Sequence, residues 1–216
     1  MITKVTILHT DLRVECGLAA DGALSRKDLV RLESACARRL TASALSHFLG
    51  RDPSEDDLRG EARTPEGKPY FPAFSDFHYS ISHSGGLVVC AAWNRPVGID
   101  LQMIPSDPEK TLKVAGRFFS VREQNALQKL QAEDPEAMLR LFARFWTARE
   151  SYIKLTGRGL AEPFDNYYPD LAENRIYTKS GETFCLTACR APEGYCMTLC
   201  SHTPVSSDNI VYQSIY

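Results

Sequence analysis

The sequence contains no long hydrophobic run. No stretch of about 18 consecutive apolar residues occurs in its 216 residues, as a membrane-spanning helix would require. The beginning of the chain, Met1–Leu8, also lacks the apolar stretch of about 7–15 residues that a secretory signal contains. These absences predict a cytoplasmic protein that does not engage a membrane.

An excess of charge of one sign is also missing. The 25 Lys and Arg residues and 27 Asp and Glu residues give a formal net charge of −2. This balance argues against a protein whose whole surface binds nucleic acid or anionic lipid, so any basic site has to be local. With 44% hydrophobic residues the chain can bury a core, and its length fits one full domain or two small ones.

Cysteines are few and scattered. There are seven, an odd number, without the dense spacing of a small disulfide-stabilised secreted domain, so we expect reduced thiols. Four of them, followed by His202, raise the alternative of a zinc site: Cys185, Cys189, Cys196 and Cys200. Zinc ligands usually lie on tight turns, whereas these cysteines lie along predicted strands, which favours buried core cysteines.

Helical spacing and capping signals predict four helices. They begin at Ser25, Asp107, Ser120 and Asp134. Apolar positions keep helical spacing in the first helix as far as Gly50, and the last helix ends before Gly157. The first helix carries five basic residues between positions 24 and 39: Arg26, Lys27, Arg31, Arg38 and Arg39. This basic face is either an ordinary solvated surface or a phosphate-binding patch.

Strand-like runs, which alternate at the start of the chain and in the last two segments, predict the strands. They cover residues 1–8, 77–82, 87–93, 97–102, 182–189 and 195–200, and the last two form a β-hairpin. In the strand 97–102, three apolar residues share one face, so Asp100 and Gln102 lie together on the other face. Two side chains with oxygen donors therefore point the same way.

The long last helix carries charges that suit phosphate chemistry. Glu150 and Lys154 lie four residues apart on one face, and Arg149 flanks Glu150. Together with Asp100 and Gln102 they suit Mg²⁺, which prefers a few oxygen ligands and completes its coordination with water and phosphate oxygens. The alternative is structural: Glu150 and Lys154 would form a surface ion pair, and Asp100 would be a strand-end residue.

A polar, glycine-containing segment follows the strand at 77–82. It reads Ser82-His83-Ser84-Gly85-Gly86 and offers hydroxyls, an imidazole and backbone N–H groups that can bind an anion. A hairpin turn explains the same residues without any ligand. The segment is not Gly-x-Ser-x-Gly, which argues against a hydrolase nucleophile.

Taken in order, five motifs resemble the Sfp-type 4′-phosphopantetheinyl transferases. They are Gly67-Lys68-Pro69, Ile81-Ser82-His83-Ser84-Gly85, Val97-Gly98-Ile99-Asp100-Leu101, Phe118-Phe119-Ser120-x-x-Glu123 and Trp146-x-x-Arg149-Glu150-x-x-x-Lys154-x-x-Gly157-x-Gly159-Leu160. The resemblance covers residues 67–160, and the basic segment with Arg38 and Arg39 resembles the family's amino-terminal coenzyme-binding stretch. The last fifty residues carry little of the family pattern.

The resemblance implies an α+β fold in which two similar α/β subdomains are related by a pseudo-twofold axis. The expected subdomains are residues 1–96, on the coenzyme A nucleotide side, and 97–216, with the metal and the catalytic helix. The implied protein is a monomer that transfers 4′-phosphopantetheine from coenzyme A to a serine of an apo acyl or peptidyl carrier protein. The reaction would need Mg²⁺ and would release 3′,5′-ADP.

Roles for individual residues follow from the same resemblance. Asp100 and Glu150 would bind Mg²⁺, with Gln102 as a third ligand directly or through water, and Glu150 would take or orient the serine proton. Lys154 would contact the pyrophosphate. The expected coenzyme A contacts are Arg38, Arg39, Lys68, Ser82, His83 and Lys154. An acidic carrier helix would dock near Phe118–Leu127.

Two residues depart from the family pattern. Gln102 replaces a carboxylate at the end of the strand motif, which predicts weaker Mg²⁺ binding, and Arg149 replaces a Lys beside Glu150. The Gln102 change motivates the alternative of a non-catalytic module that binds coenzyme A or a carrier protein. A Mg²⁺-dependent nucleotide hydrolase is a third hypothesis.

Overall fold

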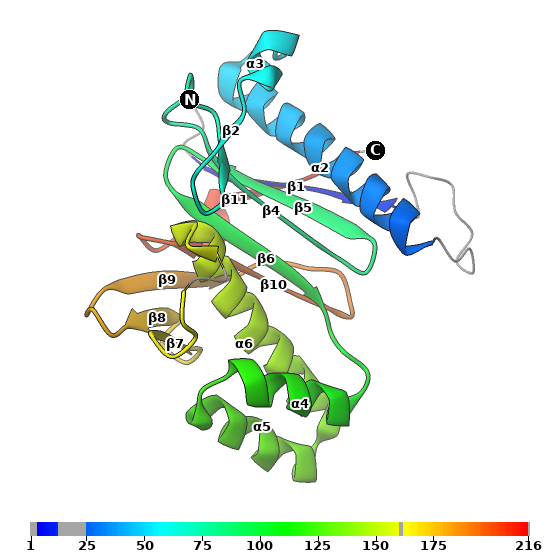
Figure 1. The fold of residues 1–216 in the computed structure, drawn as a ribbon, viewed down its shortest axis with the longest axis vertical. Helices are drawn as coiled ribbons and strands as arrows, with labels where there is room; N and C mark the ends of the chain where they lie inside the picture. The colour runs from blue at the N-terminus through cyan, green and yellow to red at the C-terminus, as the bar shows by residue number, and fades with distance from the viewer. Residues whose placement is uncertain (1–3, 13–24, 160–161, 216) are drawn as a thin grey trace.

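The computed structural model describes residues 4–12, 25–159 and 162–215, and it has a mixed α+β fold (Figure 1). Cys16, Leu160 and the first three residues of the strand predicted at 1–8 lie outside the described residues. Within the described ranges, no helix is both long enough and apolar enough to span a membrane.

Two sheets form the centre of the molecule. The first has the strand order β11-β1-β5-β4, from Ile210–Ser214, Val5–Asp11, Leu87–Trp93 and His78–Ser84. The second has the order β6-β10-β9-β8-β7, from Val97–Met103, Tyr195–Ser201, Thr183–Ala188, Arg175–Thr178 and Tyr167–Asp170. A small two-stranded sheet pairs β2, Ala62–Arg63, with β3, Pro69–Tyr70.

Helices cover the outer face of each large sheet (Figure 1). α2, Arg26–Leu49, packs on the first sheet, and α6, Pro135–Thr156, packs on the second. α4, Pro108–Phe118, and α5, Val121–Glu133, pack against α6, whereas the short α3 is Glu55–Arg59. The four predicted helices and the predicted hairpin are confirmed, with ends shifted by one or two residues.

Strand alternation explains how the layers pack. On β5, Val89 and Ala91 face the second sheet, whereas Val88 and Cys90 face α2, so both faces of this strand are buried. β6 is sandwiched in the same way, because Val97, Ile99 and Leu101 join the core between the two sheets. Residues at the even positions of β6 therefore face α6, which is where the candidate site lies.

The end of the chain returns to the first sheet. β11 pairs in parallel with β1, and the register places Ile210 opposite Val5. The first sheet therefore contains strands from both ends of the sequence. The division into 1–96 and 97–216 and the pseudo-twofold relation stay predictions.

Candidate active site

β6 and α6 approach each other closely because Gly98 has no side chain. A Cβ atom at Gly98 would lie 2.0 Å from the backbone oxygen of Ser151 and 2.4 Å from the backbone nitrogen of Leu155. Both distances are far below van der Waals contact. Gly98 thus lets the strand lie against the helix backbone, and this contact brings Asp100 of β6 next to Lys154 of α6.

Asp100 lies at the centre of a buried polar cluster. Lys154 Nζ donates to Asp100 Oδ1 at 2.6 Å, and Ser82 Oγ donates to the same oxygen at 2.8 Å. Ser82 Oγ also accepts from Lys154 Nζ at 2.9 Å and from the backbone N–H of Leu101 at 3.1 Å. Because a hydroxyl has one donor and two acceptor positions, these contacts use the full hydrogen-bonding capacity of Ser82.

The second carboxylate oxygen of Asp100 has no partner. Oδ2 is buried and accepts no hydrogen bond within the described part of the chain. Burial raises the pKa of Asp100, while Lys154 and Ser82 act in the opposite direction. An unpaired carboxylate oxygen in a buried site is costly unless a ligand engages it. The geometry is therefore suited to a cation that binds at Oδ2.

The charges of Asp100 and Lys154 also act on Glu150 of α6. Burial raises the pKa of Glu150, the charge of Asp100 raises it further, and Lys154 lowers it. Gln102, on the same face of β6 as Asp100, donates from its amide nitrogen to the Met103 carbonyl at 2.8 Å. The amide oxygen of Gln102 is then the atom of this side chain that could bind a cation. Asp100 and Gln102 thus share one face of β6, and the charge of Asp100 acts on Glu150.

A cavity of about 230 Å³ opens beside this cluster. Its lining comes from both halves of the chain and includes Lys68, Ser80, Ile81, Lys154 and Gly157. Lys68 Nζ donates to the Leu155 carbonyl at 2.6 Å, and burial lowers the pKa of Lys68 to about 8. Two lysines therefore line one small cleft, with their amines hydrogen-bonded to the Leu155 carbonyl and to Asp100 and Ser82.

His83 is placed differently from Ser82 on the same strand. The His83 side chain is 53% exposed, and its Nδ1 lies 3.1 Å from Oε2 of the buried Glu33 on α2.

Serine side chains on β4 bind the backbone of β6. Ser80 Oγ accepts from the Ile99 N–H at 3.0 Å, and Ser84 Oγ accepts from the Met103 N–H at 3.0 Å. These serines attach β4 of the first sheet to β6 of the second.

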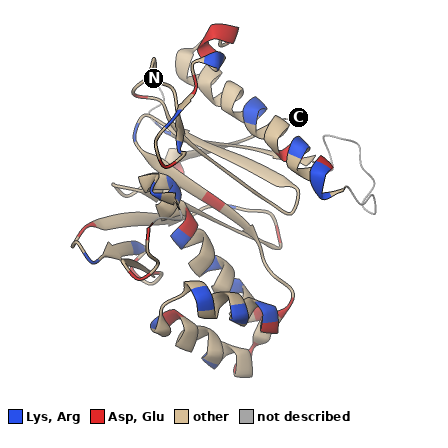
Figure 2. Ribbon diagram, viewed as in Figure 1, with Lys and Arg blue, Asp and Glu red and all other residues tan. Residues whose placement is uncertain are grey.

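The basic residues of α2 lie apart from the cleft. Arg38 and Arg39 are both exposed on this helix, whose basic residues are visible in Figure 2. Arg39 lines a different cavity, together with Asp52 and Leu58, and no residue that lines this cavity also lines the cleft. The structure does not bring the two arginines to the lysines, and their contact with coenzyme A stays a prediction.

Arg149 is turned away from the cleft. Its Nε donates to Glu123 Oε1 at 2.9 Å and its Nη1 donates to the Phe164 carbonyl at 2.9 Å. The Arg149 and Glu123 side chains are 2% and 3% exposed, so this is a buried ion pair. The guanidinium also stacks on Phe119 and Tyr167. Arg149 therefore connects α6 to α5 and adds no free charge beside Glu150.

The cysteines do not form a metal site in the described ranges. No group of three or more His, Cys, Asp or Glu side chains there is placed to hold a metal ion. Cys185 and Cys200 are buried, and Cys185 Sγ accepts from Arg175 at 2.8 Å. The spacing that raised the zinc alternative thus places the thiols in the packing of the second sheet.

Some contacts of the site residues were not predicted from the sequence. Glu33, which the sequence does not single out, is buried, and its spacing of four residues from Leu29 places it on the buried face of its helix. Glu123 is part of a family motif and forms a capping box with Ser120, but its contact with Arg149 was not predicted. The sequence carries no signal for this partner, because the burial of Arg149 is visible only in the structure.

Comparison with known proteins identifies the family. Residues 96–200 match the model of the 4′-phosphopantetheinyl transferase superfamily. A 4′-phosphopantetheinyl transferase of Bacillus subtilis is 36% identical over 67% of this chain and 63% of its own length. The 4′-phosphopantetheinyl transferase Sfp of Bacillus subtilis (strain 168) is 32% identical over 68% of this chain and 65% of its own length.

A third relative is matched over a larger share of its length. The 4′-phosphopantetheinyl transferase ffp of Bacillus subtilis is 31% identical over 71% of this chain and 67% of its own length. The matches to the first two relatives span a little less than two thirds of those proteins. The matched region contains Asp100, Glu150 and Lys154, and together these findings show that the chain belongs to the 4′-phosphopantetheinyl transferase superfamily.

Proposed function

We propose that this protein transfers 4′-phosphopantetheine from coenzyme A to a serine of an apo carrier protein, with Mg²⁺. The observation that carries the proposal is the unpaired, buried Oδ2 of Asp100 beside Lys154 and Glu150, at the edge of a cleft that also contains Lys68. Two carboxylates and two amines are the groups that a diphosphate with a divalent cation requires. The names of the relatives support the same activity.

The residues present fit a magnesium ion. Asp100 would hold it through Oδ2, Glu150 through its carboxylate, and Gln102 through its amide oxygen or a bound water. When bound, the ion neutralises negative charge on the diphosphate oxygens. Because Gln102 is neutral, we expect Mg²⁺ to bind more weakly here than in relatives with a carboxylate at this position.

The protein's own side chains would perform the transfer. Glu150, whose pKa is raised by burial and by Asp100, would accept the proton of the carrier serine. The serine oxygen would then form a bond to the β-phosphorus, the bond from phosphorus to 3′,5′-ADP would break, and Lys154 would stabilise the leaving phosphate. Lys68 and His83 would align coenzyme A, whereas Ser82 would act by holding Asp100 and Lys154 in place.

The junction of α4 and α5 is the proposed carrier surface. Val121 is 72% exposed there, Arg117 and Arg122 are exposed nearby in the sequence, and Arg122 Nη2 lies 3.7 Å from Asp170 Oδ2. Exposed apolar and basic side chains close together in the sequence suit the acidic helix of a carrier protein. We further propose that the protein acts as a cytoplasmic monomer, with pseudo-twofold-related subdomains at 1–96 and 97–216.

Mass spectrometry of apo carrier proteins tests the activity. We expect the protein, coenzyme A and Mg²⁺ to add phosphopantetheine to at least one acyl or peptidyl carrier in a panel. Coenzyme A binding in calorimetry without turnover on any carrier would instead support a non-catalytic module. Consumption of coenzyme A without a carrier would support a hydrolase.

The substitution Glu150→Gln tests the assigned proton acceptor. We expect a loss of at least about 100-fold in kcat with an unchanged unfolding midpoint, because the amide cannot accept the serine proton. Glu136→Gln, at an exposed position of the same helix, is the matched control and should retain full activity. Near-normal turnover of Glu150→Gln would contradict the assignment.

A further inference from the structure

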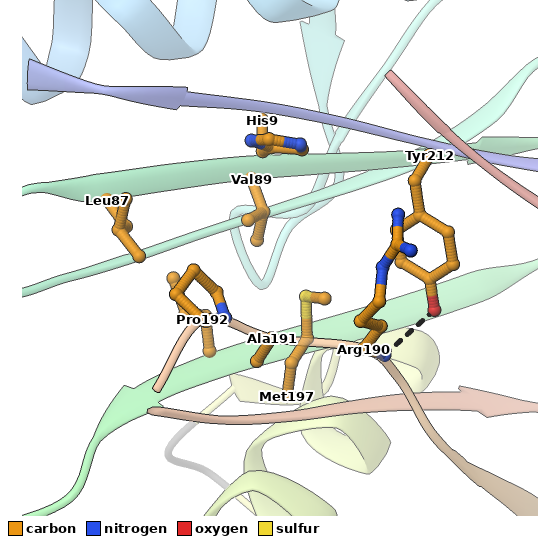
Figure 3. Close-up of a pocket in the computed structure, with 9 residues that line it drawn as sticks. His9, Leu87, Val89, Arg190, Ala191, Pro192, Met197 and Tyr212 are labelled. Carbon is orange, nitrogen blue, oxygen red and sulfur yellow. Dashed lines mark hydrogen bonds between the residues drawn. The ribbon is translucent and has the colours of Figure 1, made fainter. Parts of the chain in front are cut away.

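A second cavity, of about 320 Å³, lies between the two sheets (Figure 3). Its apolar wall comes from Leu87, Val89, Leu101 and Met197, on strands β5, β6 and β10. The turn between β9 and β10 closes one side. A volume of this size is at the lower end of the range for small-molecule sites, which is about 300–1,000 Å³.

This cavity is separate from the candidate active site. Leu101 lies next to Asp100 in β6, and successive strand residues point to opposite faces, so the cavity and the Asp100 cluster lie on opposite sides of the strand. None of its lining residues lines the cleft that contains Lys68 and Lys154.

One side of the cavity carries a positive charge from Arg190, a residue that lines the cavity and is also exposed to solvent. The Arg190 guanidinium lies 5.0 Å from the ring centroid of Tyr212, and the Arg190 backbone N–H donates to Tyr212 Oη at 2.9 Å. Figure 3 shows these two residues on one side of the cavity and Leu87 and Pro192 on the other. Among the described residues, Arg190 has no carboxylate in ion-pair contact.

The second titratable group at the cavity contributes little charge. His9 on β1 lines the cavity, and burial lowers its pKa, with a further decrease from the charge of Arg190. His9 is therefore mostly neutral near pH 7. The cavity presents one cation at an apolar chamber, which matches a ligand with one negative charge and an apolar body.

We propose that this cavity binds a small amphipathic monocarboxylate of the medium-chain fatty acid class. The carboxylate would accept hydrogen bonds from Arg190, and the hydrocarbon chain would lie among Leu87, Val89 and Met197. Stacking on Tyr212 holds the guanidinium in place, so little conformational entropy is lost when the ligand binds.

Isothermal titration calorimetry with octanoate tests the proposal. We expect saturable binding of octanoate and a decrease in affinity of about tenfold in Arg190→Gln, because glutamine keeps a hydrogen-bond donor but removes the positive charge. Octan-1-ol, which has the same chain without charge, should bind equally to the wild type and to Arg190→Gln. Arg140→Gln, at an exposed ion pair of α6, is the control and should leave octanoate binding unchanged.

A cavity-filling variant locates the bound chain. Ala191→Phe places a ring in the cavity and should abolish the binding of both probes, with folding checked by circular dichroism. If Ala191→Phe does not fold, chemical-shift perturbations by octanoate at the amides of residues 87–89 and 197 provide the same test. No saturable octanoate binding, or binding that neither variant changes, would overturn the proposal. These readouts do not depend on transferase activity, so this proposal can fail while the proposed function stands.

Discussion

The protonation of Lys68 is expected to depend on whether a ligand is bound. Its amine is held in the cleft by the Leu155 carbonyl, and burial lowers its pKa to about 8. A phosphate group bound beside it would favour the charged form and raise this pKa. Binding of coenzyme A and protonation of Lys68 are therefore coupled.

This coupling predicts how coenzyme A affinity depends on pH. The contribution of Lys68 is fully present below the pKa of the free protein, about 8, and is lost as the pH rises above it. If bound phosphate restores an ordinary lysine pKa, the Kd for coenzyme A should be about tenfold higher at pH 9 than at pH 7, which means weaker binding at pH 9. Calorimetry across this pH range measures the change.

The matched control for this pH dependence is Lys68→Arg. Its guanidinium stays charged at all these pH values, so the profile should be flat apart from the titration of coenzyme A itself. Equal pH profiles for the wild type and Lys68→Arg would show that Lys68 does not bind the phosphate.

The residues of the site were predictable where their geometry is local. Strand parity places Asp100 and Gln102 on one face, and helical spacing places Glu150 beside Lys154. The roles of Ser82 and Arg149 were not predictable, because their partners lie on other elements, far along the chain. Ser82 of the first sheet contacts Asp100 of the second sheet, and Arg149 of α6 contacts Glu123 of α5.

At the level of elements, β6 and α6 are in close backbone contact. At Gly98 the strand backbone lies so close to the helix that a Cβ atom would overlap Ser151 and Leu155. We expect Gly98→Ala to decrease the free energy of unfolding by at least about 3 kcal/mol, because two backbones have to move apart. Urea denaturation followed by circular dichroism measures this loss.

Gly116 in α4 provides the comparison. A Cβ atom there would meet no atom within 4 Å, and the residue lies in a helix. Gly116→Ala should therefore stabilise the protein by about 0.5–1 kcal/mol. Similar effects of the two substitutions would mean that β6 and α6 are not in backbone contact.

Predictability at the level of elements follows their length. The long helices α2 and α6 carry clear helical periodicity, and β4, β5 and β6 are strand-like runs of seven residues each; all five were predicted. The strands β7 and β8 are four residues each and were missed, because so short a segment shows no clear alternation. β11 was also missed, and its parallel pairing with β1, about two hundred residues away, leaves no local turn signal to indicate it.

Over the whole molecule, β11 joins the two ends of the chain to a common core. Ile210 pairs with β1 of the first sheet, and its buried side chain packs in the cluster that contains Val97 and Ile99 of the second sheet. The core between the sheets is therefore shared, and we expect both sheets to unfold in a single transition.

The substitution Ile210→Ala tests this shared core. We expect it to cost about 2–5 kcal/mol of unfolding free energy, whereas Val211→Ala, at a position that is 43% exposed, should cost about 0.5 kcal/mol or less. The two tryptophans separate the regions: Trp93 lies in the core between the sheets, and Trp146 packs on the α4–α6 cluster. In a Trp146→Phe background fluorescence reports Trp93, and in a Trp93→Phe background it reports Trp146. Ile210→Ala should decrease the urea midpoint equally in both backgrounds, because unfolding of the shared core removes the surface on which α6 packs. A shift seen by Trp93 alone would show that the helical region unfolds independently of the sheets.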